Sequence, residues 1–136
     1  MTKRKTPNKT SEPSSRLLSQ VMLHLPFPPT LNHNVRSGYG MRFRTRQYRA
    51  FIENVYWIWR TEGPRRWDRQ RRYAVVIVAY MPDKRKRDLD NIVKPTLDAL
   101  THAGAWDDDS QVDSISILRA GVRPEKPGVE IVIAYV

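Results

Sequence analysis

The stretch YAVVIVAYM at residues 73–81 is the most strand-like part of this sequence, and the elements around it decide the fold class. Its β-branched and apolar residues run without a break, which predicts a strand buried on both faces. A strand of this kind needs other elements to cover it, so the patterns on either side of it indicate how the chain is layered.

An amphipathic helix is predicted on each side of this strand. Upstream, five apolar residues of the segment 46–61 recur at i, i+3, i+4, i+7 and i+11, and Gly63 and Pro64 end the helix. Downstream, apolar residues at i, i+4 and i+7 predict a helix over 92–103 that ends at Gly104.

Pro95 complicates the start of the second helix, because proline is comfortable only where the backbone N–H would lack a helical partner anyway. Two starts therefore remain open. Either regular helix begins late, near Lys94, or the segment 88–93 forms a tight and irregular first turn.

Three further strands complete the pattern. Residues 21–27 precede a Pro-rich turn at 26–40, residues 112–122 alternate as a half-exposed strand, and residues 128–136 form the last strand. The element order is β-α-β-α-β-β. The economical architecture is a single α+β domain over residues 21–136, with two helices packed on one mixed sheet.

The charge of the chain favours partners that contain phosphate. It carries 24 Lys and Arg against 14 Asp and Glu, a net charge of +10. Residues 1–20 hold +4 of this charge and are rich in Lys, Thr, Ser and Pro, which predicts a disordered basic arm. The folded part keeps +6, so it is basic in its own right, and nucleic acid is the leading class of ligand.

The composition also excludes several classes of protein. The sequence has no cysteine, which excludes disulfide scaffolds and thiolate metal sites and fits a reducing compartment. No apolar run approaches the ~20 residues of a membrane span, and no apolar signal segment follows the basic N-terminus. We therefore expect a soluble cytoplasmic protein without a membrane partner.

The segment KRKRDLDNIVK at residues 84–94 places four cations directly before two carboxylates, Asp88 and Asp90. A second acidic cluster, Asp107-Asp108-Asp109, follows the downstream helix. If the end of strand 73–81 and the loop at 107–109 lie at the same edge of the sheet, these carboxylates could hold Mg²⁺ next to a polyanion. Lys94, four residues after Asp90, could then face the same side and stabilise charge on a phosphate.

A purely structural interpretation competes with this one. Asp88 or Asp90 could cap the N-terminus of the helix, and the segment 107–110 could be a solvated turn before a strand. For Asp98 we expect an ion pair with Lys94 across one helical turn rather than a role as a metal ligand. Spacing alone does not decide between the two interpretations.

Basic residues outside the acidic segments are the candidates for phosphate contacts that position DNA without reading its sequence. They occur before and within the start of the upstream helix (36–49), in the arginine-rich stretch 60–72, and directly before Asp88, and the first and last of these groups supply the candidates singled out here. The residues concerned are Arg42, Arg44, Arg46, Lys84, Arg85, Lys86 and Arg87.

Taken together, three segments resemble the RusA family of Holliday junction resolvases. RDLDNIVKPTLDAL (87–100) and AGAWDDDSQV (103–112) resemble its two signature segments, and PFPPTLNHNVR (26–36) resembles its N-terminal Pro-Pro-x-x-Asn segment. This joint pattern is far more specific than two spaced aspartates. It favours the functional interpretation of the carboxylates over the capping one.

The resemblance implies a Mg²⁺-dependent, homodimeric endonuclease that cuts four-way DNA junctions by paired symmetrical nicks in recombination and repair. It implies essential roles for Asp88, Asp90 and Asp109 as metal ligands and for Lys94 in catalysis, with Asp108 supporting the metal. It also implies a nucleoid-associated location. Asp107 stands where the family pattern has a non-acidic residue, which leaves the register within the three aspartates open.

Two rival functions remain at this point. A non-catalytic nucleic-acid-binding module would bind without metal and would not nick DNA. A nuclease for other branched DNA would nick without preferring a four-way junction.

Overall fold

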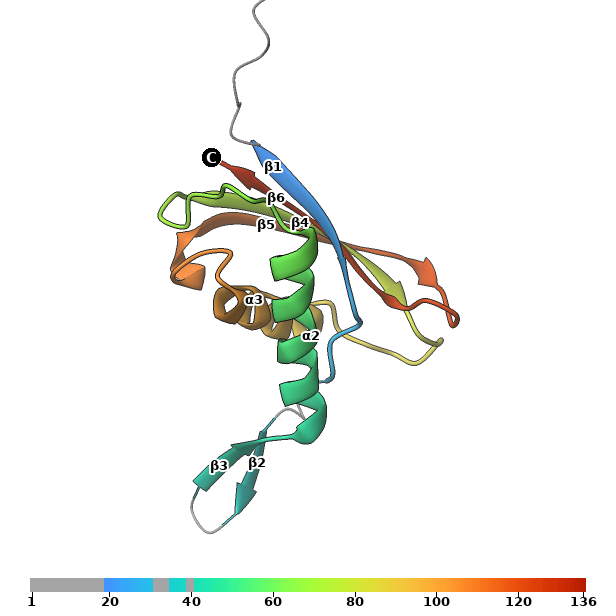
Figure 1. Cartoon of the computed structure of the whole chain (residues 1–136). Helices are drawn as coiled ribbons and strands as arrows, with labels where there is room; N and C mark the ends of the chain where they lie inside the picture. Colours follow the sequence, from blue (N-terminus) through green and yellow to red (C-terminus); the bar gives the residue numbers. More distant parts are fainter. Residues whose placement is uncertain (1–18, 31–34, 39–40) are drawn as a thin grey trace, which may run out of the picture.

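A four-stranded sheet forms the centre of the protein in a computed structural model that describes residues 19–30, 35–38 and 41–136 (Figure 1). Its strands are β1 (Gln20–Leu25), β4 (Tyr73–Met81), β5 (Val112–Val122) and β6 (Gly128–Tyr135), in the order β1-β6-β4-β5. β6 is antiparallel to both of its neighbours, whereas β4 and β5 are parallel. The predicted mixed sheet of an α+β fold is confirmed.

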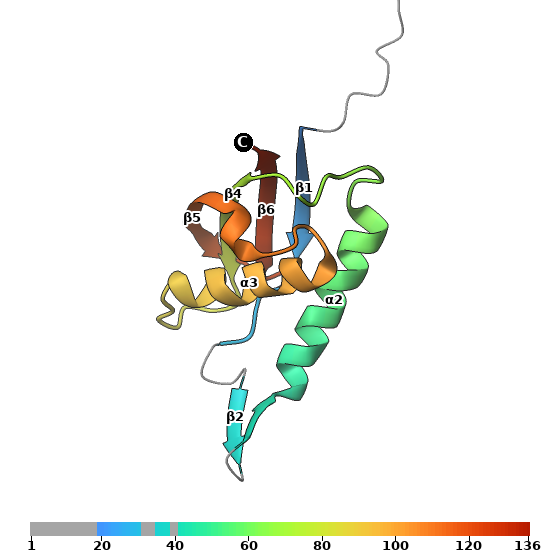
Figure 2. The ribbon, with the colours of Figure 1, turned by 90° about the vertical axis from the view of Figure 1, so that its left-hand side faces the viewer.

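Two helices lie on the same face of this sheet (Figure 2). They are α2 (Arg46–Glu62) and α3 (Asp90–Ala103), and the short 3₁₀ helix η1 (Asp109–Gln111) follows α3. Thr45 caps α2 by accepting a hydrogen bond from the Tyr48 backbone N–H at 3.2 Å. Gly104 ends α3 in a left-handed conformation with φ of 94°. Both predicted helices are confirmed.

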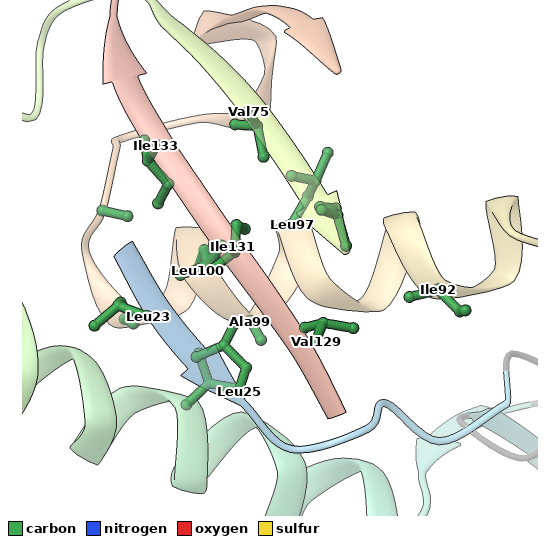
Figure 3. Packing of buried hydrophobic residues seen from close by; sticks show 14 of the residues in the cluster. Leu23, Leu25, Val75, Ile92, Leu97, Ala99, Leu100, Val129, Ile131 and Ile133 are labelled. Atoms are coloured by element: carbon green, nitrogen blue, oxygen red, sulfur yellow. The ribbon is translucent and has the colours of Figure 1, made fainter. Parts of the chain in front are cut away.

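The side of the sheet that faces the helices carries the hydrophobic core (Figure 3). Leu25 of β1, Ile77 of β4, Ile131 of β6 and Leu100 of α3 are fully buried there. The side chains of this core come from every layer, which holds α3 and α2 at fixed positions over the strands.

The prediction that strand 73–81 is buried on both faces was wrong. Burial alternates along β4, so that Val75 and Ile77 are buried while Val76 between them is 40% exposed. Both helices pack on one face only, and within the described residues no helix covers the other face. Continuous apolar sequence therefore does not distinguish a central strand of a two-layer fold from one of a three-layer fold.

The start of α3 follows the second of the two predicted possibilities. The Asn91 N–H donates to the Asp88 carbonyl and the Ile92 N–H to the Leu89 carbonyl, three residues back in each case. This tight 3₁₀-type turn precedes regular helix, and Pro95 lies inside α3. Helix thus begins at Asp90 rather than near Lys94.

A two-stranded hairpin was not predicted. β2 (Val35–Gly38) pairs with β3 (Met41–Arg44) inside and beyond the segment interpreted as a Pro-rich turn. Strands of four residues in a stretch rich in Arg and Gly give too little alternation to be detected. The predicted basic arm falls mostly on residues 1–18, which lie outside the described residues.

No helix in the described parts of the chain is long and apolar enough to cross a membrane.

Candidate active site

The carboxylates at the start of α3 do not cap it. The N-cap residue is Leu89, and no side chain makes a cap hydrogen bond there. Asp88 and Asp90 are both exposed, and the Asp90 Oδ1 accepts a hydrogen bond from the neighbouring Asn91 N–H, at 3.1 Å. The capping interpretation of these two residues was therefore wrong, and their carboxylates face solvent at the positive end of the helix dipole.

The expected route by which the two acidic clusters would meet was also wrong. Because β4 and β5 are parallel, Tyr73 pairs with Val112 and Met81 pairs with Val122. The turn before Val112 therefore lies beside the start of β4, at the opposite end of the strands from the end of β4. The structure instead brings Lys94 of α3, and not the carboxylates before it, to 4.0 Å from Asp109, because α3 crosses the face of the sheet and contacts η1 (Figure 2).

Lys94 is the residue that links α3 to the acidic turn. Its Nζ lies 3.0 Å from the Asp98 Oδ1 and 4.0 Å from the Asp109 Oδ2. The hydrogen bond to Asp98, followed by the charges of Asp98 and Asp109, raises the pKa of Lys94 above its ordinary value. The predicted pair of Lys94 with Asp98 is confirmed, and the ammonium group stays charged beside Asp109.

The three aspartates of the acidic turn have three different surroundings. Asp107 forms an ion pair with Arg69 at 2.9 Å. Asp108 is the N-cap of η1, and the hydrogen bonds from Ser110 lower the pKa of its carboxyl. Asp109 begins η1 and faces Lys94. The turn interpretation thus holds for Asp108, whereas Asp109 is the member that reaches α3.

The basic run before Asp88 divides into two parts. Lys84, Arg85 and Lys86 are exposed, and the Arg85 side chain is 84% exposed. Arg87 is only 16% exposed and forms a two-pronged ion pair with Asp83, at 2.5 and 3.1 Å. Hydrogen bonds from Arg87 and from the Arg85 N–H lower the pKa of Asp83 to about 2.

Asp83 was missed by the sequence analysis, although its i, i+4 spacing to Arg87 was a usable signal. Its pair fixes the loop that leads into Asp88, and the Arg119 side chain donates to the Arg87 carbonyl from β5. The loop is therefore anchored at Arg87, while its tip carries the exposed cations.

The remaining candidate arginines lie at the start of α2. Arg46 is the exposed first residue of that helix, and Arg42 and Arg44 belong to β3, which leads directly into it. The second arginine-rich stretch, residues 60–72, begins in the last turn of α2 and leads to β4. In that stretch Arg72 pairs with Asp113 and donates to the Ser110 carbonyl at 2.9 Å, next to the acidic turn.

The described residues contain no group of three His, Asp or Glu side chains that could hold a metal ion by themselves. Asp88, Asp90 and Asp109 nonetheless offer exposed or half-exposed oxygen donors. Mg²⁺ needs only one or two protein carboxylates when water and substrate phosphate complete its shell. Asp109 already lies 4.0 Å from the positive charge of Lys94, and carboxylate oxygens are the type of donor that suits a hard divalent cation.

Similarity to known proteins extends over most of the chain. A family profile described as "Endodeoxyribonuclease RusA" matches residues 26–134. The chain is 33% identical over 105 residues to a protein named crossover junction endodeoxyribonuclease rusA from Enterobacteria phage HK97, covering 75% of this chain and 84% of that protein. It is 35% identical over 105 residues to the protein of that name from Escherichia coli strain K12, covering 72% and 81%. The chain therefore belongs to the RusA endodeoxyribonuclease family.

Proposed function

We propose that this protein is a Mg²⁺-dependent endonuclease that resolves four-way DNA junctions by paired, symmetrical nicks. The relatives named above are crossover junction endodeoxyribonucleases, which supports this class of substrate. The observation that carries the proposal is the position of Lys94, whose ammonium lies between a carboxylate of its own helix and Asp109 of a separate turn. A lysine whose pKa is raised by carboxylates of two separate elements is a candidate for a functional site.

Asp88, Asp90 and Asp109 would hold the metal, with Asp108 in support through the turn that it caps. When bound, Mg²⁺ supplies a lowered pKa for a coordinated water and stabilises charge on the scissile phosphate. The exposed positions of Asp88 and Asp90 at the start of α3 leave both carboxylates accessible to a substrate.

Lys94 would keep a positive charge at the phosphate. Asp98 accepts its hydrogen bond and holds the side chain across one helical turn, which limits the rotamers that the lysine can adopt. The raised pKa keeps the amine protonated at neutral pH, so it can stabilise negative charge that develops on the phosphate or the leaving oxygen.

Basic residues outside the acidic segments would bind the arms of the junction. Lys84, Arg85 and Lys86 at the loop tip and the arginines around the start of α2, namely Arg42, Arg44 and Arg46, contribute charge without base recognition. Arg87 would contact DNA from the base of its loop, where the ion pair with Asp83 fixes the position of its guanidinium group.

We further propose that the protein acts as a homodimer in the cytoplasm, associated with the nucleoid. A four-way junction has two equivalent strands to cut, and a two-fold symmetric dimer presents one site to each. Sedimentation velocity of the full chain tests this point, and a monomer that nicks one strand per binding event would overturn it.

The decisive experiment incubates the full chain with an end-labelled synthetic four-way junction or a matched linear duplex, with Mg²⁺ or with EDTA. We expect paired nicks on opposing strands of the junction only, and only with Mg²⁺. Binding to both DNAs without a nick would identify a binding module, and nicking of flaps or forks as readily as junctions would identify a nuclease for other branched DNA.

A further inference from the structure

Two segments far apart in the sequence are held together beside the candidate site. We call residues 65–72 the basic segment and residues 107–111 the acidic turn. The Arg69 side chain pairs with Asp107 at 2.9 Å, and the Trp67 Nε1 donates to the Ala105 carbonyl at 2.8 Å, just before the turn. The basic segment is therefore docked on the turn that carries Asp109.

The side-chain amide of Gln111 is at the centre of this contact. Its Oε1 accepts from the backbone N–H groups of Asp107 and Asp108, both at 2.9 Å. Its Nε2 donates to the carbonyls of Arg69 and Arg71, both at 2.8 Å. Both amide protons and both lone pairs are thus used, and all four partners are backbone groups.

We propose that Gln111 is a positioning residue that couples the acidic turn to the basic segment, so that Asp109 and the arginines of that segment meet DNA as one unit. The role of Asp109 in this statement rests on the proposed function. The coupling itself rests only on the four hydrogen bonds.

The ion pairs around Gln111 do not replace it. The Arg69 and Asp107 side chains are 55% and 52% exposed, and exposed pairs of this kind contribute little and weaken with salt. The four hydrogen bonds of Gln111 fix the backbone of both segments, whereas an ion pair between two flexible side chains leaves the backbone free to move. Only an amide has the two donors and the two-fold acceptor that this position requires, since glutamate accepts but does not donate.

Two substitutions separate the two halves of the contact. Gln111→Met keeps the approximate length of the side chain and removes all four hydrogen bonds. Gln111→Glu keeps an acceptor for the N–H groups of the turn and loses both bonds to the basic segment. Gln20→Met, at the exposed first residue of β1, is the matched control.

The first measurement is amide hydrogen exchange of the full chain without DNA or metal, followed on peptides that cover residues 63–72 and 105–113. We expect Gln111→Met to speed exchange in both peptides and Gln111→Glu to speed it in the first more than in the second. Exchange that stays at the wild-type rate in both variants would overturn the coupling, whether or not the protein proves to be a nuclease.

The second measurement is the Mg²⁺ concentration that gives half-maximal nicking of the junction, together with junction binding in EDTA. Loss of a residue that orients a metal ligand typically weakens metal affinity by roughly 10- to 100-fold, so we expect a rise of that order in Gln111→Met. A variant with lower thermal stability but an unchanged Mg²⁺ requirement would have a structural role only, and this would overturn the positioning role. If the wild-type protein does not nick at all, the proposed function fails and the exchange result still decides the coupling.

Discussion

At the first turn of α3, the exposed Asp90 accepts one hydrogen bond from the backbone N–H of its own neighbour. Asparagine can accept the same bond through its side-chain oxygen. Substitution of Asp90 by asparagine therefore removes the negative charge while it leaves this hydrogen bond in place.

We expect Asp90→Asn to lower the rate of junction cleavage by more than roughly 100-fold, because a metal ligand is lost. Junction affinity in EDTA should stay the same or increase, because one negative charge near phosphate is removed. Gel-based cleavage and fluorescence anisotropy measure the two effects. Glu62→Gln, at the exposed last residue of α2, removes a charge elsewhere and should change neither. A variant of Asp90 that fails to fold would contradict this prediction, because it would show that the side chain matters to the fold itself.

The pair of Asp83 with Arg87 makes stability depend on pH. The pKa of Asp83 is about 2, lowered from an ordinary 3.8. Because the folded value is the lower one, the pair stabilises the fold above pH ~4, and this contribution is lost as the pH falls through about 2. Asp83→Asn should therefore be less stable than the wild type at pH 7 and equally stable near pH 2.

Urea unfolding at pH 7, 4, 3 and 2 measures this difference. Glu125→Gln, in the turn between β5 and β6, is the control for loss of a surface charge. A difference between Asp83→Asn and the wild type that does not change with pH would mean that the pair contributes through shape and not through charge.

At the scale of the element, local backbone geometry sets both ends of α3. The helix tolerates Pro95 in its interior, begins with a 3₁₀-type turn, and ends at Gly104 with φ of 94°. A Cβ atom on Gly104 would lie 3.7 Å from the Arg69 side chain, an ordinary contact. The constraint at this position is thus the backbone conformation and not the available space.

Gly104→Ala should lower the free energy of unfolding by about 1–2 kcal/mol, the cost of a left-handed conformation for a residue with a Cβ. Gly104→Asn should cost less, because asparagine tolerates this region through local hydrogen bonds. Chemical denaturation of both variants checks the order. An asparagine variant less stable than the alanine variant would indicate a steric cause instead.

Most elements were predictable because their patterns are local. The apolar spacing of α2 and α3 and the glycine after α3 were sufficient to predict both helices, with α2 ending one residue later than expected. The hairpin of β2 and β3 was not predictable, since four-residue strands in an Arg-rich stretch have no clear period. The exposed face of β4 was not predictable either, because a continuous apolar segment does not reveal whether helices cover one face of the sheet or both.

At the scale of the whole molecule, a net charge of +10 implies that DNA binding is sensitive to salt. The exposed loop tip is one source of this charge. Lys86→Ala should reduce the slope of log affinity against log salt by about one phosphate contact, for junction and duplex alike, and leave stability unchanged. Anisotropy titrations in EDTA between 50 and 200 mM salt, concentrations chosen to span the usual range of this effect, provide the slope.

Arg87→Ala is the informative comparison for that variant. Because Arg87 is mostly buried in its pair with Asp83, its removal should destabilise the fold, and Lys86→Ala should not. An unchanged salt slope in Lys86→Ala would mean that the loop tip lies outside the DNA interface.

The candidate residues Asp88, Asp90, Lys94 and Asp109 could be proposed from the sequence alone because its motifs resemble those of a known family, whereas their spacing by itself left the capping interpretation open. The class of fold and the pair of Lys94 with Asp98, which lies within one helical turn, were likewise predictable from the sequence. The sequence was also sufficient to suggest a basic protein that binds phosphate.

Only the tertiary structure decided how Lys94 meets the acidic turn. The parallel pairing of β4 and β5 puts the turn that contains Asp109 beside the start of β4, far from its end. The path of α3 across the sheet then brings Lys94 to this turn. The hydrogen bonds from Gln111 to the carbonyls of Arg69 and Arg71 also join segments that are far apart in the sequence. Such contacts depend on which strand order and helix path bury the most apolar surface of the whole chain, and no local pattern of residues contains that information.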